Sequence, residues 1–339
     1  MIPSKPETDF GLFVPPGGPK IWARMGIRAA YGMALLEIRK NNPKVFAMSA
    51  DLGRSSGLGR FAEEFPDSYL NVGIAEQLMI SMSAGLARTG RSVFASTFAP
   101  FATLRAGEFM RMEMGYMQMP VTVVGLGSGL SLGYLGNSHY GLEDIGVVRS
   151  MAGISIFSPA DASEMILTLN RLAQNPEPAY LRLTGAPQSP ALFDSISETQ
   201  SIESSFFGKV GTKLVVSTGA ISGEVRRAVE SLGLDLKGEL DFGFLHVNQI
   251  KPLGETTRKI LEASNDILVL EEHLAYGGLS SAIRDARSDQ VGKMSTRIKS
   301  INLGEEFPQQ QSHQRGLELA GLSSFAIQAV LKEFVKSDE

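Results

Sequence analysis

Residues 71–111 read NVGIAEQLMISMSAGLARTGRSVFASTFAPFATLRAGEFMR, and this stretch decides the fold. Its apolar residues predict a helix that ends at Gly90, then a short strand, then a second helix from Phe101. Glu76 lies where a strand passes into the first helix, and Phe98 lies where the next strand ends. Strands that alternate with helices are typical of a parallel sheet covered on both faces. We therefore expect Glu76, Phe98 and Phe101 near the carboxyl ends of parallel strands, where α/β proteins bind ligands.

The same alternation extends on both sides of this stretch as far as residue 186. Short apolar runs predict strands, and helical spacing predicts the helices between them, including one helix over 22–41 and another over 101–117. The periodicity is lost over 187–208, which is rich in Ser and Pro, and a second β/α series follows. We predict an arm over 1–20, a first domain over 21–186, a linker over 187–208 and a second domain over 209–339. The predicted fold class is α/β: a parallel sheet with helices on both faces, followed by a smaller α/β domain with a mixed sheet.

Composition excludes several classes of function. The chain has 339 residues, no cysteine and a formal net charge of −4, so it has no disulfide, thiolate zinc site or basic nucleic-acid-binding character. The first residues lack the features of a secretion signal, and no apolar run reaches the length of a membrane span. We expect a cytoplasmic protein without a nucleic-acid or membrane partner. The histidines are scattered, so we expect no metal site in this chain; they are His139, His246, His273 and His313.

A carboxylate that faces paired aromatic side chains suits an aminopyrimidine. The ring stacks on the aromatic faces, and the carboxyl group bonds a ring nitrogen. The run N-V-G-I-A-E-Q, followed by S-T-F, resembles the pyrimidine-binding domain of transketolases and of 1-deoxyxylulose-5-phosphate synthases. The resemblance implies that Glu76 activates thiamine diphosphate for loss of its C2 proton, and that Phe98 and Phe101 flank the pyrimidine. It also places Ile74 beside the cofactor, and Leu104 at the third aromatic position of the pocket.

The resemblance covers nearly the whole chain from about residue 21. The run ADLGRSS is similar to the transketolase A-D-L-x-x-S loop, which implies cofactor contact by Asp51 and substrate contact by Ser55. Arg28 lies at the family spacing for an arginine that binds the substrate phosphate. GNSHYGLEDIGVVRSM resembles the family's G-x-T-H-Q segment and places His139 at the catalytic histidine, which also contacts substrate.

The sequence contains no G-D-G motif, which in this family belongs to the domain that binds Mg²⁺ and the diphosphate. The resemblance therefore implies the C-terminal subunit of a split transketolase. The expected partner is an N-terminal subunit that ligates Mg²⁺ and the cofactor diphosphate, in an α2β2 assembly. The expected reaction moves a two-carbon ketol unit from a ketose donor to an aldehyde acceptor.

Four positions depart from the family pattern. An aspartate that reads a substrate hydroxyl is Leu135 here, and the residue after the histidine is Tyr140 instead of Gln. Two phosphate ligands of the family fall on Gly127 and Gly185. Because glycine cannot replace the bidentate contacts of arginine, we expect a substrate other than an ordinary pentose or hexose phosphate.

Two other interpretations remain open. One is a decarboxylating subunit, either the β chain of a 2-oxoacid dehydrogenase or a relative of deoxyxylulose-phosphate synthase, since both share the pyrimidine-side glutamate. The other is a non-catalytic scaffold subunit, which the altered positions would fit. The A-D-L-x-x-S loop and His139 favour ketol transfer, and the retention of Glu76 with both phenylalanines argues against a scaffold.

Overall fold

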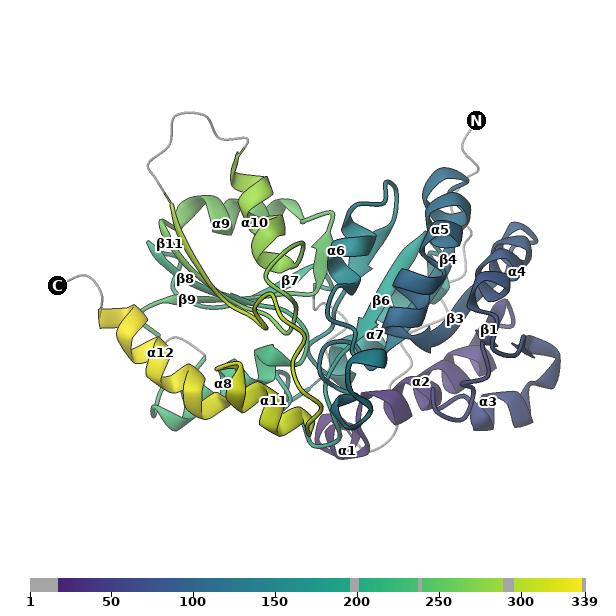
Figure 1. Cartoon of the computed structure of the whole chain (residues 1–339), viewed down its shortest axis with the longest axis horizontal. Helices are drawn as coiled ribbons and strands as arrows, with labels where there is room; N and C mark the ends of the chain where they lie inside the picture. Colours follow the sequence, from purple (N-terminus) through teal and green to yellow (C-terminus); the bar gives the residue numbers. More distant parts are fainter. Residues whose placement is uncertain (1–17, 196–200, 237–239, 289–295, 337–339) are drawn as a thin grey trace.

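The computed structural model describes residues 18–195, 201–236, 240–288 and 296–336. It has two α/β lobes that lie side by side (Figure 1). The first lobe contains a seven-stranded sheet in the order β10-β5-β6-β4-β3-β1-β2. Its strands are β1 Val45–Ser49, β2 Tyr69–Asn71, β3 Ser92–Phe98, β4 Val121–Leu126, β5 Ser155–Phe157, β6 Ala179–Leu183 and β10 Gln249–Lys251.

Helices cover both faces of this sheet, and each face has its own apolar core. On one face lie α1 Gly18–Met25, α2 Ile27–Asn41, α3 Gly59–Glu64 and α7 Ala162–Gln174. On the other face lie α4 Glu76–Arg88, the helical segment η2 Phe101–Arg105, α5 Gly107–Phe109 and η3 Met110–Tyr116, and α6 Asp144–Arg149. Short 3₁₀ turns are η1 Pro66–Ser68 and η4 Gly133–Ser138.

The second lobe contains a five-stranded mixed sheet in the order β12-β11-β8-β9-β7. Its strands are β7 Ser204–Gly208, β8 Lys213–Ser217, β9 Gly243–Val247, β11 Asp266–Leu270 and β12 Arg297–Ile301, of which β7 runs antiparallel to β9. In Figure 1, α9 Glu255–Ala263 and α10 Leu279–Ser288 lie on one side of it, and α8 Ile221–Ser231 and α12 Ser324–Lys336 on the other. The remaining helix is α11 His313–Leu319. The predicted fold class is confirmed.

The two lobes are joined through backbone pairing and a shared core. Directly after β9, the chain leaves the second sheet, and β10 pairs antiparallel with β5 at the edge of the first sheet. One continuous apolar cluster runs from Met79 and Val121 of the first lobe to Val216 and Ile283 of the second. The lobes therefore pack as one body.

Four local features differ from the sequence-based expectation. The helix predicted over 22–41 is broken at Gly26, whose φ of 79° is left-handed, so α1 and α2 are separate. The first sheet has one antiparallel edge strand, because β10 comes from the second lobe. The segment 204–208, assigned to the linker, forms β7. Of the predicted arm, residues 18–20 begin α1, and the rest lies outside the described residues.

The helix predicted over 101–117 is present but wound differently. The segments η2 and η3 are π-helical, with α5 between them. A π-helical turn accommodates one extra residue and shifts every later side chain around the axis; such turns are frequent at functional sites. Hydrophobic spacing at the α-helical period does not reveal this change.

Candidate functional site

The sheet order brings the candidate loops to one edge. Strands β1, β3 and β4 are parallel neighbours, and β2 lies beside β1. Their carboxyl ends therefore meet. Phe98 is the last residue of β3, and the segments that follow β1, β2 and β4 carry Asp51, Glu76 and His139. This is the position where open parallel sheets bind ligands.

Glu76 is the first residue of α4, and its side chain is only 2% exposed. Its Oε1 accepts a hydrogen bond from Arg105 Nη1 at 2.8 Å. Its Oε2 is buried and has no hydrogen-bond partner among the described residues. A buried acceptor without a partner costs about 1–3 kcal/mol. An orphaned carboxylate oxygen of this kind is therefore suited to a donor that comes from a ligand.

Three rings are grouped beside this carboxylate. The centroids of Phe98 and Phe101 are 5.9 Å apart, and the imidazole of His139 lies 5.9 Å from Phe98 and 5.4 Å from Phe101, edge-on to both. The Nδ1 of His139 is within 2.8 Å of Ser138 Oγ, which leaves Nε2 for another contact. The structure thus brings together four of the residues that the sequence singles out.

Arg105 completes this group, although the sequence pattern does not single it out. Its Cζ lies 4.4 Å from the centroid of the Phe101 ring while its Nη1 bonds Glu76, and its side chain is 45% exposed. Arg105 is the last residue of the π-helical turn η2. The one available signal was a basic residue four positions after Phe101.

The residues present fit an aminopyrimidine. The unpaired Oε2 of Glu76 offers an acceptor in a buried position, as a ring nitrogen requires. Phe98 is buried and Phe101 is partly exposed, so the two rings offer apolar faces at a site that opens to the surface. Across 18–195, 201–236, 240–288 and 296–336, no three His, Asp or Glu side chains are grouped in a way that would hold a metal ion.

Two predicted substrate residues, Arg28 and Ser55, and the predicted cofactor residue Asp51 line two neighbouring cavities, whereas His139 lines neither. One, of about 450 Å³, is lined by Asp51, Ser55, Tyr69 and Asn71 among others. Asp51 has a left-handed backbone, with φ 58°, and its amide donates to Asn71 Oδ1 at 2.9 Å. The other, of about 390 Å³, is lined by Arg28, Ser55, Gly185 and their neighbours. Arg54 and Ser55 line both cavities, so the Ala50–Ser56 loop separates them.

The two glycines at family phosphate positions have left-handed backbones. Gly127 has a φ of 65°, and a Cβ there would lie 2.5 Å from Leu132. Gly185 has a φ of 93°, and a Cβ there would lie 3.0 Å from Ala220. Larger residues would be strained at both positions. The local backbone at Gly127 and Gly185 therefore favours glycine over a larger side chain.

Ile74 and Leu104 are on the surface. Ile74 is 76% exposed and Leu104 is 54% exposed. Further exposed apolar side chains lie on α4 and on the segment that packs against it. We call this surface the apolar face; it consists of Ile74, Leu78, Met82, Leu104 and Phe109. It adjoins the Glu76 group, because α4 begins at Glu76 and Leu104 precedes Arg105.

The second lobe holds the loop that carries His139. Tyr140 donates its hydroxyl to the carbonyls of Gly133 at 3.3 Å and Gln309 at 3.2 Å. The side-chain amide of Gln310 donates to the carbonyl of Tyr134 at 2.6 Å. Tyr140, one of the departures from the family pattern, therefore ties this loop to the segment before α11.

Glu272 provides a second tie to the same loop. Its Oε1 accepts from the backbone amide of Leu130 at 2.6 Å and lies 3.0 Å from His313 Nε2. Burial of the His313 imidazole opposes its protonation, but the charge and hydrogen bond of Glu272 outweigh this, so the pKa of His313 is raised above 6.5.

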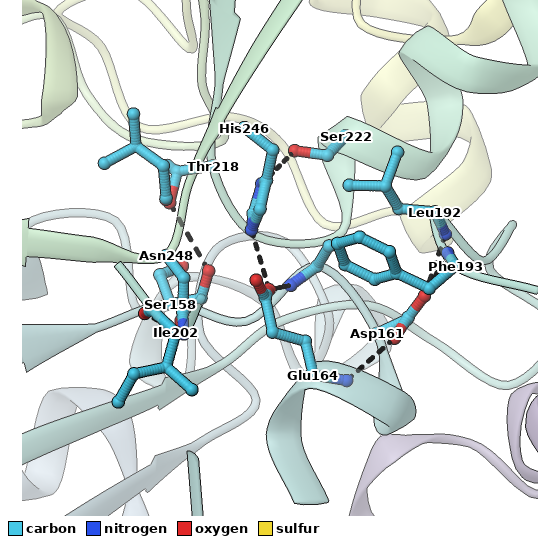
Figure 2. A network of polar contacts seen from close by, with 12 residues as sticks. Ser158, Asp161, Glu164, Leu192, Phe193, Ile202, Thr218, Ser222, His246 and Asn248 are labelled. Carbon is cyan, nitrogen blue, oxygen red and sulfur yellow. Dashed lines mark hydrogen bonds and ion pairs between the residues drawn. The ribbon is translucent and has the colours of Figure 1, made fainter. Parts of the chain in front are cut away.

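A fully buried Ser–His–Glu arrangement lies at the junction of the lobes (Figure 2). His246 Nδ1 is 2.6 Å from Ser222 Oγ, and its Nε2 is 2.7 Å from Glu164 Oε2. Glu164 Oε2 also accepts from the amide of Ala160 at 2.7 Å. Figure 2 shows the side chains of Glu164, His246 and Ser222 pointing toward one another; they come from α7, β9 and α8, and Ser222 is 0% exposed. A buried hydroxyl cannot meet a substrate, so the arrangement is structural.

The part of the chain that the structure describes contains no helix long and apolar enough to cross a membrane.

Comparison with known proteins gives a consistent picture. Residues 23–186 match the model of the family described as "Transketolase, pyrimidine binding domain". The chain is 30% identical over 318 residues to the putative transketolase C-terminal section of Methanocaldococcus jannaschii, covering 92% of this chain and 97% of that one. It is 31% identical over 313 residues to a subunit of the apulose-4-phosphate transketolase of Phocaeicola vulgatus, covering 90% and 97%.

Among solved structures, the chain is similar to one described as "Split gene transketolase, inactive beta4 tetramer". The TM-score is 0.74 at 27% sequence identity, and the match covers 93% of this chain and 100% of that one.

Proposed function

Since the chain belongs to the transketolase family, as the C-terminal subunit of a split enzyme, we propose that it transfers two-carbon ketol units with thiamine diphosphate. The observation that carries the proposal is the buried, unpartnered Oε2 of Glu76 beside the rings of Phe98 and Phe101. When bound, thiamine diphosphate supplies the carbon nucleophile and electron sink that this reaction needs. The protein supplies binding, orientation and proton transfer.

The residues of this chain would divide that work. Glu76 would hold the ring nitrogen at Oε2, and Phe98 and Phe101 would pack on the ring faces. His139 would move protons at Nε2, because its Nδ1 is engaged by Ser138. Asp51 would contact the cofactor from the Ala50–Ser56 loop.

The apolar face supports the proposal that this chain binds a partner subunit. It is exposed on this chain and adjoins the Glu76 group, so a second chain that covers it would also close the cofactor site. We propose that the partner is the N-terminal transketolase subunit, which would bind Mg²⁺ and the diphosphate, in an α2β2 assembly. The solved relative described as an inactive β4 tetramer fits a subunit that is inactive without its partner.

The lining of the two cavities supports the proposal that the substrate is a sugar other than an ordinary pentose or hexose phosphate. Arg28 and Ser55 line one cavity, but Gly185 lines the same cavity and carries no charge. The relative named for apulose 4-phosphate indicates that members of this group act on unusual sugars. The cytoplasmic location stays a prediction.

The test is binding of thiamine diphosphate to the reconstituted pair of subunits by calorimetry, followed by a ketol-transfer assay. We expect Glu76→Ala to weaken cofactor binding and to abolish transfer, while the pair still assembles. Unchanged affinity for the cofactor in Glu76→Ala would contradict the proposal.

Pyruvate turnover without an aldehyde acceptor would favour a decarboxylating subunit, and assembly without cofactor binding would favour a scaffold. If xylulose 5-phosphate and ribose 5-phosphate were the best substrates, the proposed difference in substrate would be wrong.

A further inference from the structure

Arg105 contacts two groups that a pyrimidine ring would also contact, the Glu76 carboxylate and the Phe101 ring. Its Nη1 lies 2.8 Å from Glu76 Oε1, and its Cζ lies 4.4 Å from the centroid of Phe101. A guanidinium is planar, donates hydrogen bonds in its plane and stacks on aromatic faces. An aminopyrimidine is also planar, also donates in its plane and also stacks. The two groups therefore use the same kinds of contact to the same carboxylate and the same ring.

We propose that Arg105 closes the pyrimidine site in the free subunit, and that its guanidinium leaves Phe101 and Glu76 when the cofactor ring binds. The inference rests on the proposed function and adds a gating residue to it. A ring that stacks on the side of Phe101 covered by the guanidinium cannot share that space with it. Arg105 is 45% exposed, so its guanidinium can turn outward into solvent. Glu76 stays buried, and its Oε1 loses this partner as the cofactor ring binds.

The position of Arg105 in the chain links this movement to the partner. Arg105 ends the π-helical turn η2 and follows Leu104, which belongs to the apolar face. A chain that packs on Leu104 contacts the backbone that carries Arg105. Partner docking and release of Glu76 Oε1 are therefore coupled, and in the free subunit Arg105 keeps that oxygen paired.

The experiment measures the affinity of the purified full chain for thiamine by isothermal titration calorimetry. Thiamine carries the pyrimidine without the diphosphate. Arg105→Met removes the charge and donors but keeps an unbranched apolar stem. Arg111→Met is the matched control, because Arg111 lies in the next π-helical segment, η3, and pairs with the exposed Glu108. Glu76→Gln, alone and combined with Arg105→Met, tests whether binding uses the proposed carboxylate. Thermal denaturation checks that each variant is folded, and Arg105→Lys provides a second, milder change.

We expect Arg105→Met to bind thiamine about five times more tightly than wild type, which corresponds to about 1 kcal/mol, the upper range for an ion pair with an exposed partner. Arg111→Met should match wild type, Arg105→Lys should fall between, and Glu76→Gln should remove the gain. If Arg105→Met binds no more tightly than wild type, or both show no binding, the gating inference is overturned. If thiamine binds and Glu76→Gln leaves its affinity unchanged, the proposed function itself fails.

Discussion

At the scale of single residues, a buried ion pair within the first lobe also contacts the second lobe through one hydrogen bond. The guanidinium of Arg182 lies against Asp144, with Nε 2.8 Å from Oδ2, and its Nη2 donates to the carbonyl of Glu272 at 2.9 Å. Tyr180 donates its hydroxyl to the same carboxylate at 2.9 Å. Asp144 and Arg182 are both almost fully buried. Removal of one partner leaves the other charge buried without compensation.

We therefore expect Arg182→Met to destabilise the protein by about 3–5 kcal/mol. The measurement is urea denaturation followed by circular dichroism. Arg315→Met is the control, because Arg315 pairs with Glu318 on the surface, and such pairs contribute about 0–1 kcal/mol. Equal losses in the two variants would mean that burial of the Arg182 pair does not govern its contribution.

His313 gives the protein a pH dependence in the neutral range. Its folded-state pKa is raised by the charge of Glu272, with a smaller contribution from Glu224. The pairing is therefore fully present below pH 6.5 and is lost as the pH rises through the folded-state pKa. We expect the stability advantage of wild type over His313→Gln to shrink as the pH rises above 6.5 and through the folded-state pKa, measured by urea denaturation at each pH. An advantage that grows with pH would contradict the assigned pairing.

The residue scale also shows what sequence alone can predict of the site. Glu76, Phe98 and Phe101 follow strands of one parallel sheet, and local spacing predicts that they meet. Arg105 was missed because a π-helical turn shifts side chains by an amount that apolar periodicity does not report. The contact of Tyr140 with Gln309 joins residues 169 positions apart, and no local pattern predicts such a pairing.

At the scale of elements, the loop that carries His139 depends on the other lobe for its shape. Gly133 is pressed against Gln311, whose carbonyl oxygen would lie 2.1 Å from a Cβ at that position. The hydroxyl of Tyr140 then bonds the carbonyls of Gly133 and Gln309. The position of His139 is therefore set partly by the segment before α11.

We expect Tyr140→Phe to cost about 1 kcal/mol of stability, because one hydroxyl is lost and two carbonyls lose a donor. Hydrogen exchange of residues 133–140 should become faster, because the loop loses its tie to the second lobe. Tyr134→Phe is the matched control, since the Tyr134 side chain in the same loop is largely exposed. Exchange that is unchanged in Tyr140→Phe would show that other contacts hold the loop.

The same scale explains where element prediction failed. Strands of five or six residues that are rich in apolar side chains, such as β4 and β8, can be recognised from their pattern. The three-residue strand β10 cannot be separated from β9 in this way, because one residue, Asn248, lies between them and the change of sheet is a tertiary event. The break at Gly26 was missed because an isolated glycine inside a helical pattern is usually tolerated.

At the scale of the whole molecule, the two lobes share one core, and the apolar face is exposed at the outer side of the first lobe, where Figure 1 shows α4 and α5. A shared core favours unfolding as one unit. An exposed apolar face favours association. The chain therefore has the character of a stable subunit that is made to bind another chain.

If the apolar face binds another chain, a charge placed in it should prevent association. Leu78 is 49% exposed on α4, so a lysine at this position can keep its charge in water in the free subunit. In a complex the same charge would be desolvated without a partner, which costs several kcal/mol. We expect Leu78→Lys to leave the unfolding free energy of the free chain nearly unchanged, and to abolish both self-association and assembly with the N-terminal subunit, as measured by light scattering after gel filtration.

Phe325→Lys is the matched control, because Phe325 is 83% exposed on α12 of the other lobe. If Phe325→Lys disrupts assembly while Leu78→Lys does not, the interface between subunits lies on the second lobe, and the cofactor site would have to be closed by some other means than the chain that covers α4.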